Sequence, residues 1–104
     1  MRLTDRLVVL DSNDEPVVSS VPCYMGHKGG GTAGNTEYQP IYYQERAAAI
    51  VKLPEMIGRL VLSNPTGYRV QHRNLIYRVV AAQARYRSHG RLNHMTLDLE
   101  RPAT

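Results

Sequence analysis

The sequence predicts an all-β protein: a small antiparallel β-barrel or sandwich of six or seven short strands with one long glycine-rich loop. Short apolar runs recur at about 8 to 12-residue spacing, with turn-forming residues between them, and this pattern is typical of such folds. The chain has 104 residues, which is enough for one domain and too few for two separate cores. Cys23 is the single cysteine, so no disulfide forms within the chain.

The first two strands are expected to form a hairpin-like pair. Residues 5–10 (DRLVVL) are short, apolar and rich in β-branched side chains, and the turn formers DSNDEP end them. Residues 17–24 (VVSSVPCY) are extended again. Pro22 cannot donate a ladder hydrogen bond, which predicts an edge strand or a bulge at that position.

Residues 25–43 (MGHKGGGTAGNTEYQPIYY) are predicted to be a long loop, because they contain five glycines and a proline and show neither regular period. Loops beyond about 12 to 15 residues in a compact domain usually serve binding, or stay disordered until a partner orders them. Tyr38, Tyr42 and Tyr43 at the far end favour the binding role. A flexible linker would not need them.

The middle of the chain leaves one choice open. Residues 45–53 (ERAAAIVKL) suit a helix by their three alanines and a strand by their alternation, and we favour the strand. Pro54 then begins a single helical turn over 54–58, followed by a short strand at 59–62 and a turn at SNPTG.

The C-terminal part is predicted to end in a hairpin and one further strand. Residues 68–71 and 74–82 pair around His72-Arg73, and YRSHGRLNH turns the chain. Residues 94–100 then alternate Met95, Leu97 and Leu99 with polar side chains, which is typical of a half-buried strand.

The charge and aromatic composition indicate contacts with partners. The formal net charge is +4, and eleven of the thirteen cationic side chains are arginines, which suit carboxylates and phosphates at interfaces. Tyrosine occurs seven times while phenylalanine and tryptophan are absent. No apolar stretch is long enough to span a membrane and no export signal is visible, so we expect a soluble protein without a membrane partner.

No motif predicts catalysis, a cofactor or a metal. The segment from Gly29 to Thr36 has the spacing of a phosphate-binding loop, but Asn35 stands where the lysine belongs. Cys23 lies near His27 in the sequence, yet no third group or pocket is evident, so we expect a buried small residue. The histidines form no short-spaced ligand set and are expected at the surface or in turns: His27, His72, His89 and His94.

A basic, tyrosine-rich segment is the main interface candidate. Arg85, Tyr86, Arg87 and Arg91 lie close together with His89. Further arginines and tyrosines precede them: Arg69, Arg73, Arg78, Tyr68 and Tyr77. Arginine and tyrosine are enriched at protein interfaces, which we favour here, while a nucleic-acid surface and a solvated rim remain alternatives.

The order of these segments resembles the head-closure proteins of long-tailed bacteriophages, also called head-to-tail stoppers or head-tail joining proteins. The resemblance spans most of the chain. It is carried by DRLVVL with its turn, the long loop, AAAIVKLPEMIGRLVL, GYRV leading into NLIYRVV, and GRLNHMTLDLER.

The resemblance implies a non-catalytic virion subunit that assembles in the host cytoplasm. It would form a six- or twelve-fold ring between the portal or adaptor proteins and the tail terminator or tube proteins. The long loop would then block DNA exit and could contact the packaged DNA. Its implied plug residues are Lys28, Gly29, Gly30, Gly31, Gly34 and Asn35. A small nucleic-acid-binding barrel is the alternative function.

Overall fold

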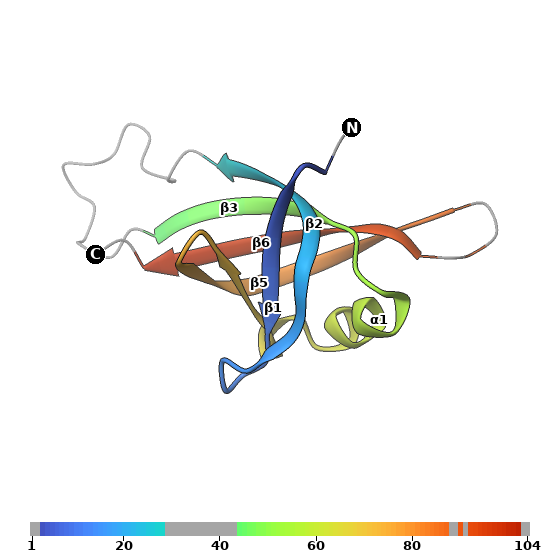
Figure 1. The fold of residues 1–104 in the computed structure, drawn as a ribbon, viewed down its shortest axis with the longest axis horizontal. Coiled ribbons are helices and arrows are strands. Elements are labelled where there is room, and N and C mark those ends of the chain that lie inside the picture. The colour runs from blue at the N-terminus through green and yellow to red at the C-terminus, as the bar shows by residue number, and fades with distance from the viewer. Residues whose placement is uncertain (1–2, 29–43, 88–89, 91, 103–104) are drawn as a thin grey trace.

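A computed structural model describes residues 3–28, 44–87, 90 and 92–102, and these residues form a closed barrel of six antiparallel strands with one α-helix (Figure 1). Around the barrel the strands follow the order β1-β2-β3-β6-β5-β4, and β4 pairs with β1. The elements are β1 (Asp5–Leu10), β2 (Pro16–Lys28), β3 (Gln44–Val51), α1 (Glu55–Ser63), a 3₁₀ turn (Pro65–Gly67), β4 (Arg69–His72), β5 (Leu75–Tyr86) and β6 (Leu92–Pro102). The predicted all-β barrel is confirmed.

Alternating side chains of the strands fill the barrel. Ala47, Ala49 and Val51 of β3 are buried, whereas Ala48 and Ile50 between them are only partly covered. This period of two decides the open choice for residues 45–53 in favour of the strand. Inward side chains of the other strands complete one core: Leu7, Val9, Val21, Cys23, Val70, Tyr77, Val79, Met95, Leu97 and Leu99.

The prediction of an edge strand or a bulge at Pro22 is wrong, because the β1–β2 pairing is regular there, with Arg6 opposite Pro22. Strand β2 is no edge strand, because it pairs with β1 and with β3. Lys52 N–H donates to the Pro22 carbonyl at 3.1 Å, and regular pairing with β3 begins one residue later, at Cys23. A proline fits this end of the ladder, because it accepts this hydrogen bond through its carbonyl but has no N–H to donate a second one.

The bulges of β2 lie on its other side, toward β1. The pairing runs from Leu7↔Val21 to Val9↔Val18, which leaves one extra residue in β2, and Ser20 has a positive φ of 53°. A bulge of this kind bends the strand and increases its twist. It helps a short strand to follow the curvature of a closed barrel.

Three strands are longer than the sequence predicted. Strand β2 continues through 25–28, which were expected to belong to the loop, because these residues pair with 46–49 of β3. Strand β5 reaches Tyr86, and β6 spans Leu92–Pro102 instead of 94–100. The β4–β5 turn is Arg73-Asn74, one residue later than predicted, and both residues have positive φ values, which suits a two-residue hairpin turn.

The predicted strand at 59–62 is wrong, because these residues belong to α1. The helix begins after Pro54 and ends before Asn64, whose N–H donates to the Leu60 carbonyl at 3.2 Å. Gly58 and Val61 are buried on one helical face, and Arg59 donates to Glu55 at 2.9 Å four residues earlier. The apolar run of LVL alone indicated a strand, but its spacing with Ile57 and Gly58 fits the helical period.

Helix α1 packs against β6 through Gly58. A β-carbon at this position would collide with the Leu92 side chain and lie 3.1 Å from Met95 Sδ. Met95 is fully buried, so it has little room to move. The glycine therefore allows the close approach of the helix to the strand.

We expect Gly58→Leu to lower the free energy of unfolding by about 1 to 3 kcal/mol, because the new side chain overpacks the contact with Leu92 and Met95. Met56→Leu is the matched control, since Met56 lies on the same helix and is 76% exposed. Urea denaturation measures both variants. Equal stability of Gly58→Leu and the unmodified protein would contradict the close packing.

Candidate functional site

The β5–β6 hairpin carries the candidate interface beyond the body of the barrel. The paired ends of β5 and β6 extend past α1 as a two-stranded ribbon, on the right of Figure 1. We call residues 85–87 and 92–94 the β5–β6 arm. Arg85, Tyr86 and Arg87 are all exposed, with Tyr86 at 57%. The pairing shifts between Arg85↔His94 and Tyr86↔Leu92, so the arm is irregular near its tip.

Most of the other arginines of the predicted basic region are neutralised by carboxylates. Arg69 pairs with Asp14 at 2.8 Å, Arg73 with Asp5 at 3.4 Å, and Arg78 with Glu100. These partners are distant in the sequence and come together only through the sheet. The basic surface is therefore smaller than the sequence predicted.

Arg85 and Arg87 differ from these arginines. Within the described ranges, neither of them forms an ion pair with a carboxylate, and Arg87 Nε donates to the neutral Asn93 Oδ1 at 3.2 Å. The charge of both guanidinium groups is therefore not neutralised by a carboxylate, and the N–H groups other than Arg87 Nε remain available to a partner. The arm is thus the place where the positive charge of this region remains available.

The three tyrosines of the region have different environments. Tyr77 is fully buried in the core, so its predicted place on a basic, exposed face is wrong. Tyr68 is half-buried and packs against the core. Tyr86 alone of the three is exposed, beside Arg85 and Arg87. Strand alternation explains the difference, since 77 lies in phase with the buried Val79.

A groove of about 490 Å³ lies at the base of the arm. It is lined by Leu3, Pro22, Ile50, Lys52, Asn93 and His94. His94 is half-buried in strand β6 and is not a turn residue. The arm and this groove form one continuous stretch of the outer surface, because Asn93 and His94 belong to both.

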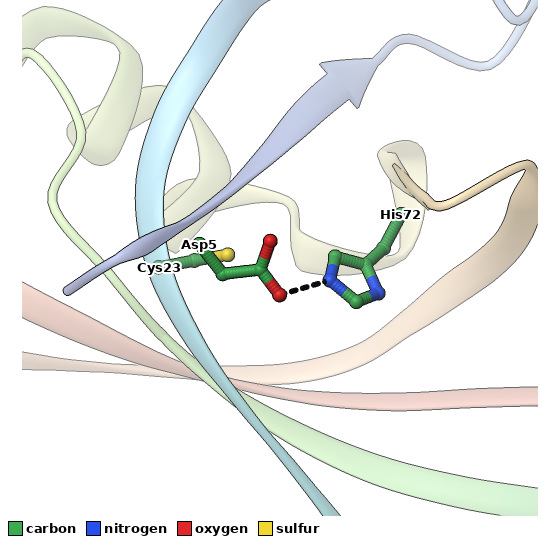
Figure 2. A group of neighbouring side chains, drawn as sticks. All are labelled: Asp5, Cys23 and His72. Atoms are coloured by element: carbon green, nitrogen blue, oxygen red, sulfur yellow. Dashed lines mark hydrogen bonds and ion pairs between the residues drawn. The ribbon is translucent and has the colours of Figure 1, made fainter.

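Asp5, Cys23 and His72 form a second cluster, inside one end of the barrel (Figure 2). Their possible ligand atoms all lie within 4.8 Å of one another. His72 Nε2 is 2.6 Å from Asp5 Oδ2, and His72 is 6% exposed. The expectation of a surface or turn position for His72 is therefore wrong. The prediction that Cys23 is buried is confirmed, but its polar neighbours come from β1 and β4.

Asp5 was not among the predicted site residues, although its place in the strand pattern indicates an inward position. Asp5 lies two residues before Leu7 and four before Val9, so strand alternation places all three on the inward face. A carboxylate on such a face needs a polar partner. The partner, His72, is 67 residues away and could not be identified from spacing.

The electrostatics of the cluster favour an ionised carboxylate and a protonated thiol. The hydrogen bond from His72, together with the Arg6 backbone N–H, lowers the pKa of Asp5. Burial and the Asp5 charge raise the pKa of Cys23 to about 11. His72 Nε2 already donates to Asp5, so this nitrogen is not free to act as a base toward the thiol. The geometry does not resemble a cysteine nucleophile activated by histidine.

Several predicted residues lie outside the part of the chain that the structure describes. These are Gly29, Gly30, Gly31, Gly34, Asn35, Tyr38, Tyr42, Tyr43, His89 and Arg91. His27 and Lys28 belong to β2 by their backbone. The predictions for these residues stay predictions.

Comparison with protein-family models, with curated proteins and with solved structures finds no match for this chain. Among the described residues, no helix is long and apolar enough to cross a membrane.

We expect Cys23 to react with iodoacetamide at least about 100-fold more slowly in the native, metal-free protein at pH 8 than in denaturant. The side chain is fully buried, and a pKa of about 11 leaves little thiolate at this pH. Mass spectrometry of the alkylated chain measures both rates, and Cys23 is the single thiol. Similar rates in the two conditions would contradict the buried position.

Proposed function

We propose that this protein is a non-catalytic head-closure subunit of a long-tailed bacteriophage. It forms a homo-oligomeric ring between the portal or adaptor proteins and the tail, and it retains the packaged DNA until the tail attaches. The observation that carries the proposal is the position of two extensions at opposite ends of one barrel: the β5–β6 arm, and the strand ends that flank residues 29–43 (Figure 1).

Two opposed extensions suit a protein that contacts partners on both sides. A closed barrel has no free sheet edge through which a further strand could add, so association has to use side chains and projecting segments. The arm supplies such a projection at one end. At the other end, Lys28 and Gln44 lie on the neighbouring strands β2 and β3, so both ends of the 29–43 segment are anchored to the barrel there.

The composition of the arm supports a protein partner. Arg85, Tyr86 and Arg87 are exposed, and the two arginines have no carboxylate partner among the described residues. Arginine and tyrosine are enriched in the energetic centres of protein interfaces. In a ring, the same arm of each copy meets the same surface of its neighbour, which makes the contact repeat around the axis.

A nucleic-acid-binding barrel is the alternative. The pairing of Arg69, Arg73 and Arg78 with carboxylates argues against it, because specific and non-specific binding both depend on several free cations facing the phosphates. Tight, salt-dependent binding of a labelled oligonucleotide by the isolated monomer would favour this alternative over the ring subunit.

We expect Arg85→Ala and Tyr86→Ala to change the free energy of unfolding by less than about 0.5 kcal/mol, because both side chains are exposed. Assembly of tailed particles should fall by about tenfold or more, since interface anchors of this type carry much of the binding energy. Electron microscopy counts joined particles, and urea denaturation measures stability. The matched control is Arg59→Ala, an exposed arginine on α1 that already pairs with Glu55. If Arg85→Ala or Tyr86→Ala instead unfolded the protein, while the molecules that still folded assembled normally, the assignment of these residues to an interface would be wrong.

We expect deletion of residues 29–35 to leave the barrel folded and rings on the portal stack intact, because shortening a loop changes its closure entropy only slightly. The deletion starts after the last residue of β2. Tailless heads that carry the shortened protein should lose DNA, which nuclease sensitivity of the packaged genome reports. If these heads retained their DNA to the same extent as heads with the unmodified protein, residues 29–35 would not be the plug. The proposed ring contacts through the arm would be unaffected by that result.

A further inference from the structure

We propose that Asp5, Cys23 and His72 form a binding site for one Zn²⁺ ion at the end of the barrel. The proposal is independent of the ring function. It concerns the cluster of Figure 2, in which β1, β2 and β4 each contribute one side chain.

The three donor atoms match the chemistry of zinc. Thiolate sulfur, imidazole nitrogen and carboxylate oxygen are the usual protein ligands of Zn²⁺, and three of them with a water molecule complete a tetrahedral site. Hard cations such as Mg²⁺ and Ca²⁺ prefer oxygen ligands, so Cys23 and His72 disfavour them.

The separations are close to those that zinc requires. Ligand atoms bound to one tetrahedral Zn²⁺ at its usual bond lengths are about 3.3 to 3.7 Å apart. In the cluster, His72 Nε2 and Asp5 Oδ2 are 2.6 Å apart, and all three ligand atoms lie within 4.8 Å of one another. Binding requires Asp5 Oδ2 and His72 Nε2 to separate by about 1 Å.

The backbone holds the ligands in place. Asp5 and Cys23 are directly opposite each other in the β1–β2 ladder, so their side chains project to the same side. His72 is the last residue of β4, on the strand that pairs with the other edge of β1. The ligands therefore come from three adjacent strands, and the site is largely formed before the ion binds.

The charge balance also favours a divalent ion. A carboxylate and a thiolate carry two negative charges, and Zn²⁺ neutralises both in a region where Cys23 and His72 are buried. Binding releases the thiol proton to solvent. The Nε2 proton of His72 is lost or moves to Nδ1, so that Nε2 presents its lone pair to the metal.

Asp5 and Arg73 are on the solvent-accessible side of the cluster. The Asp5 side chain is 31% exposed, and Arg73, which lies 3.4 Å from Asp5 Oδ2, is 77% exposed. A long exposed side chain such as Arg73 can move into solvent at little cost. The incoming cation then replaces its charge beside the carboxylate.

The ion would strengthen the closure of the barrel. Strands β1 and β4 share only three paired positions, Val8↔Gln71, Val9↔Val70 and Leu10↔Arg69. The Asp5–His72 contact lies beyond these pairs and is the next connection between the two strands. A metal bound to both residues and to Cys23 would join β4, β1 and β2 at this end.

The test is titration of the full, reduced and metal-free chain with Co²⁺ and with Zn²⁺. Cobalt in this site should give one equivalent of binding, a thiolate-to-cobalt charge-transfer band in the ultraviolet, and visible bands typical of tetrahedral coordination. Zinc should displace the cobalt, raise the melting temperature, and slow alkylation of Cys23. Absence of stoichiometric binding at micromolar metal, or binding without the thiolate band, would overturn the proposal.

Variants assign the ligands. Cys23→Ser should abolish the charge-transfer band, and Asp5→Asn and His72→Gln should each weaken binding at least tenfold, since losing even an outer-sphere partner can cost this much. His94→Gln is the matched control, because His94 is a half-buried strand histidine outside the cluster. Circular dichroism of the metal-free variants checks folding, and Asp5→Asn, at a partly exposed position, keeps the test valid if a buried variant unfolds. Unchanged binding by folded Asp5→Asn would exclude this site.

Discussion

The ladder between β1 and β4 closes the barrel, and the rest of the structure depends on this closure. It contains three paired positions in strands of six and four residues, whereas β5 and β6 pair over most of their length. Without it, the inward faces of Leu7, Val9 and Val70 would border solvent. The partly buried contact of Asp5 with His72 lies at the end of the same ladder, where the Asp5 carboxylate gives the buried His72 a polar partner.

Closure also determines how the protein can associate. A closed sheet offers no unpaired strand to a second chain, so any assembly must use side chains on the outside or segments that leave the barrel. Strands β5 and β6 continue beyond the core and present Arg85 and Tyr86 on a narrow ribbon. Strand β2 ends at Lys28 and β3 begins at Gln44 at the opposite end of the barrel. These two features support the proposed function more strongly than the body of the barrel does.

The distribution of charge follows from the sheet. Arg69, Arg73 and Arg78 each lie near a carboxylate on another strand or turn, with partners 55, 68 and 22 residues away. Surface pairs of this kind add little stability, but they remove positive charge from the surface that a partner meets. Although the formal net charge is +4, the unpaired positive charge is spread less evenly over the surface than the sequence suggests. The arm retains two arginines, Arg85 and Arg87, that have no carboxylate partner among the described residues.

The sequence by itself determined the fold class, the first strand, the strand at 45–53 and the burial of Cys23, because these depend on local alternation and turn residues. It was wrong at 59–62, where the three apolar residues 60–62 fit either period and packing of Gly58 against β6 favours the helix. Only the tertiary structure decided that Tyr77 is buried, that three arginines are paired, and that Asp5 meets Cys23 and His72. The reason is physical: these contacts join residues on different strands, and their partners depend on strand register and barrel closure, which no local pattern specifies.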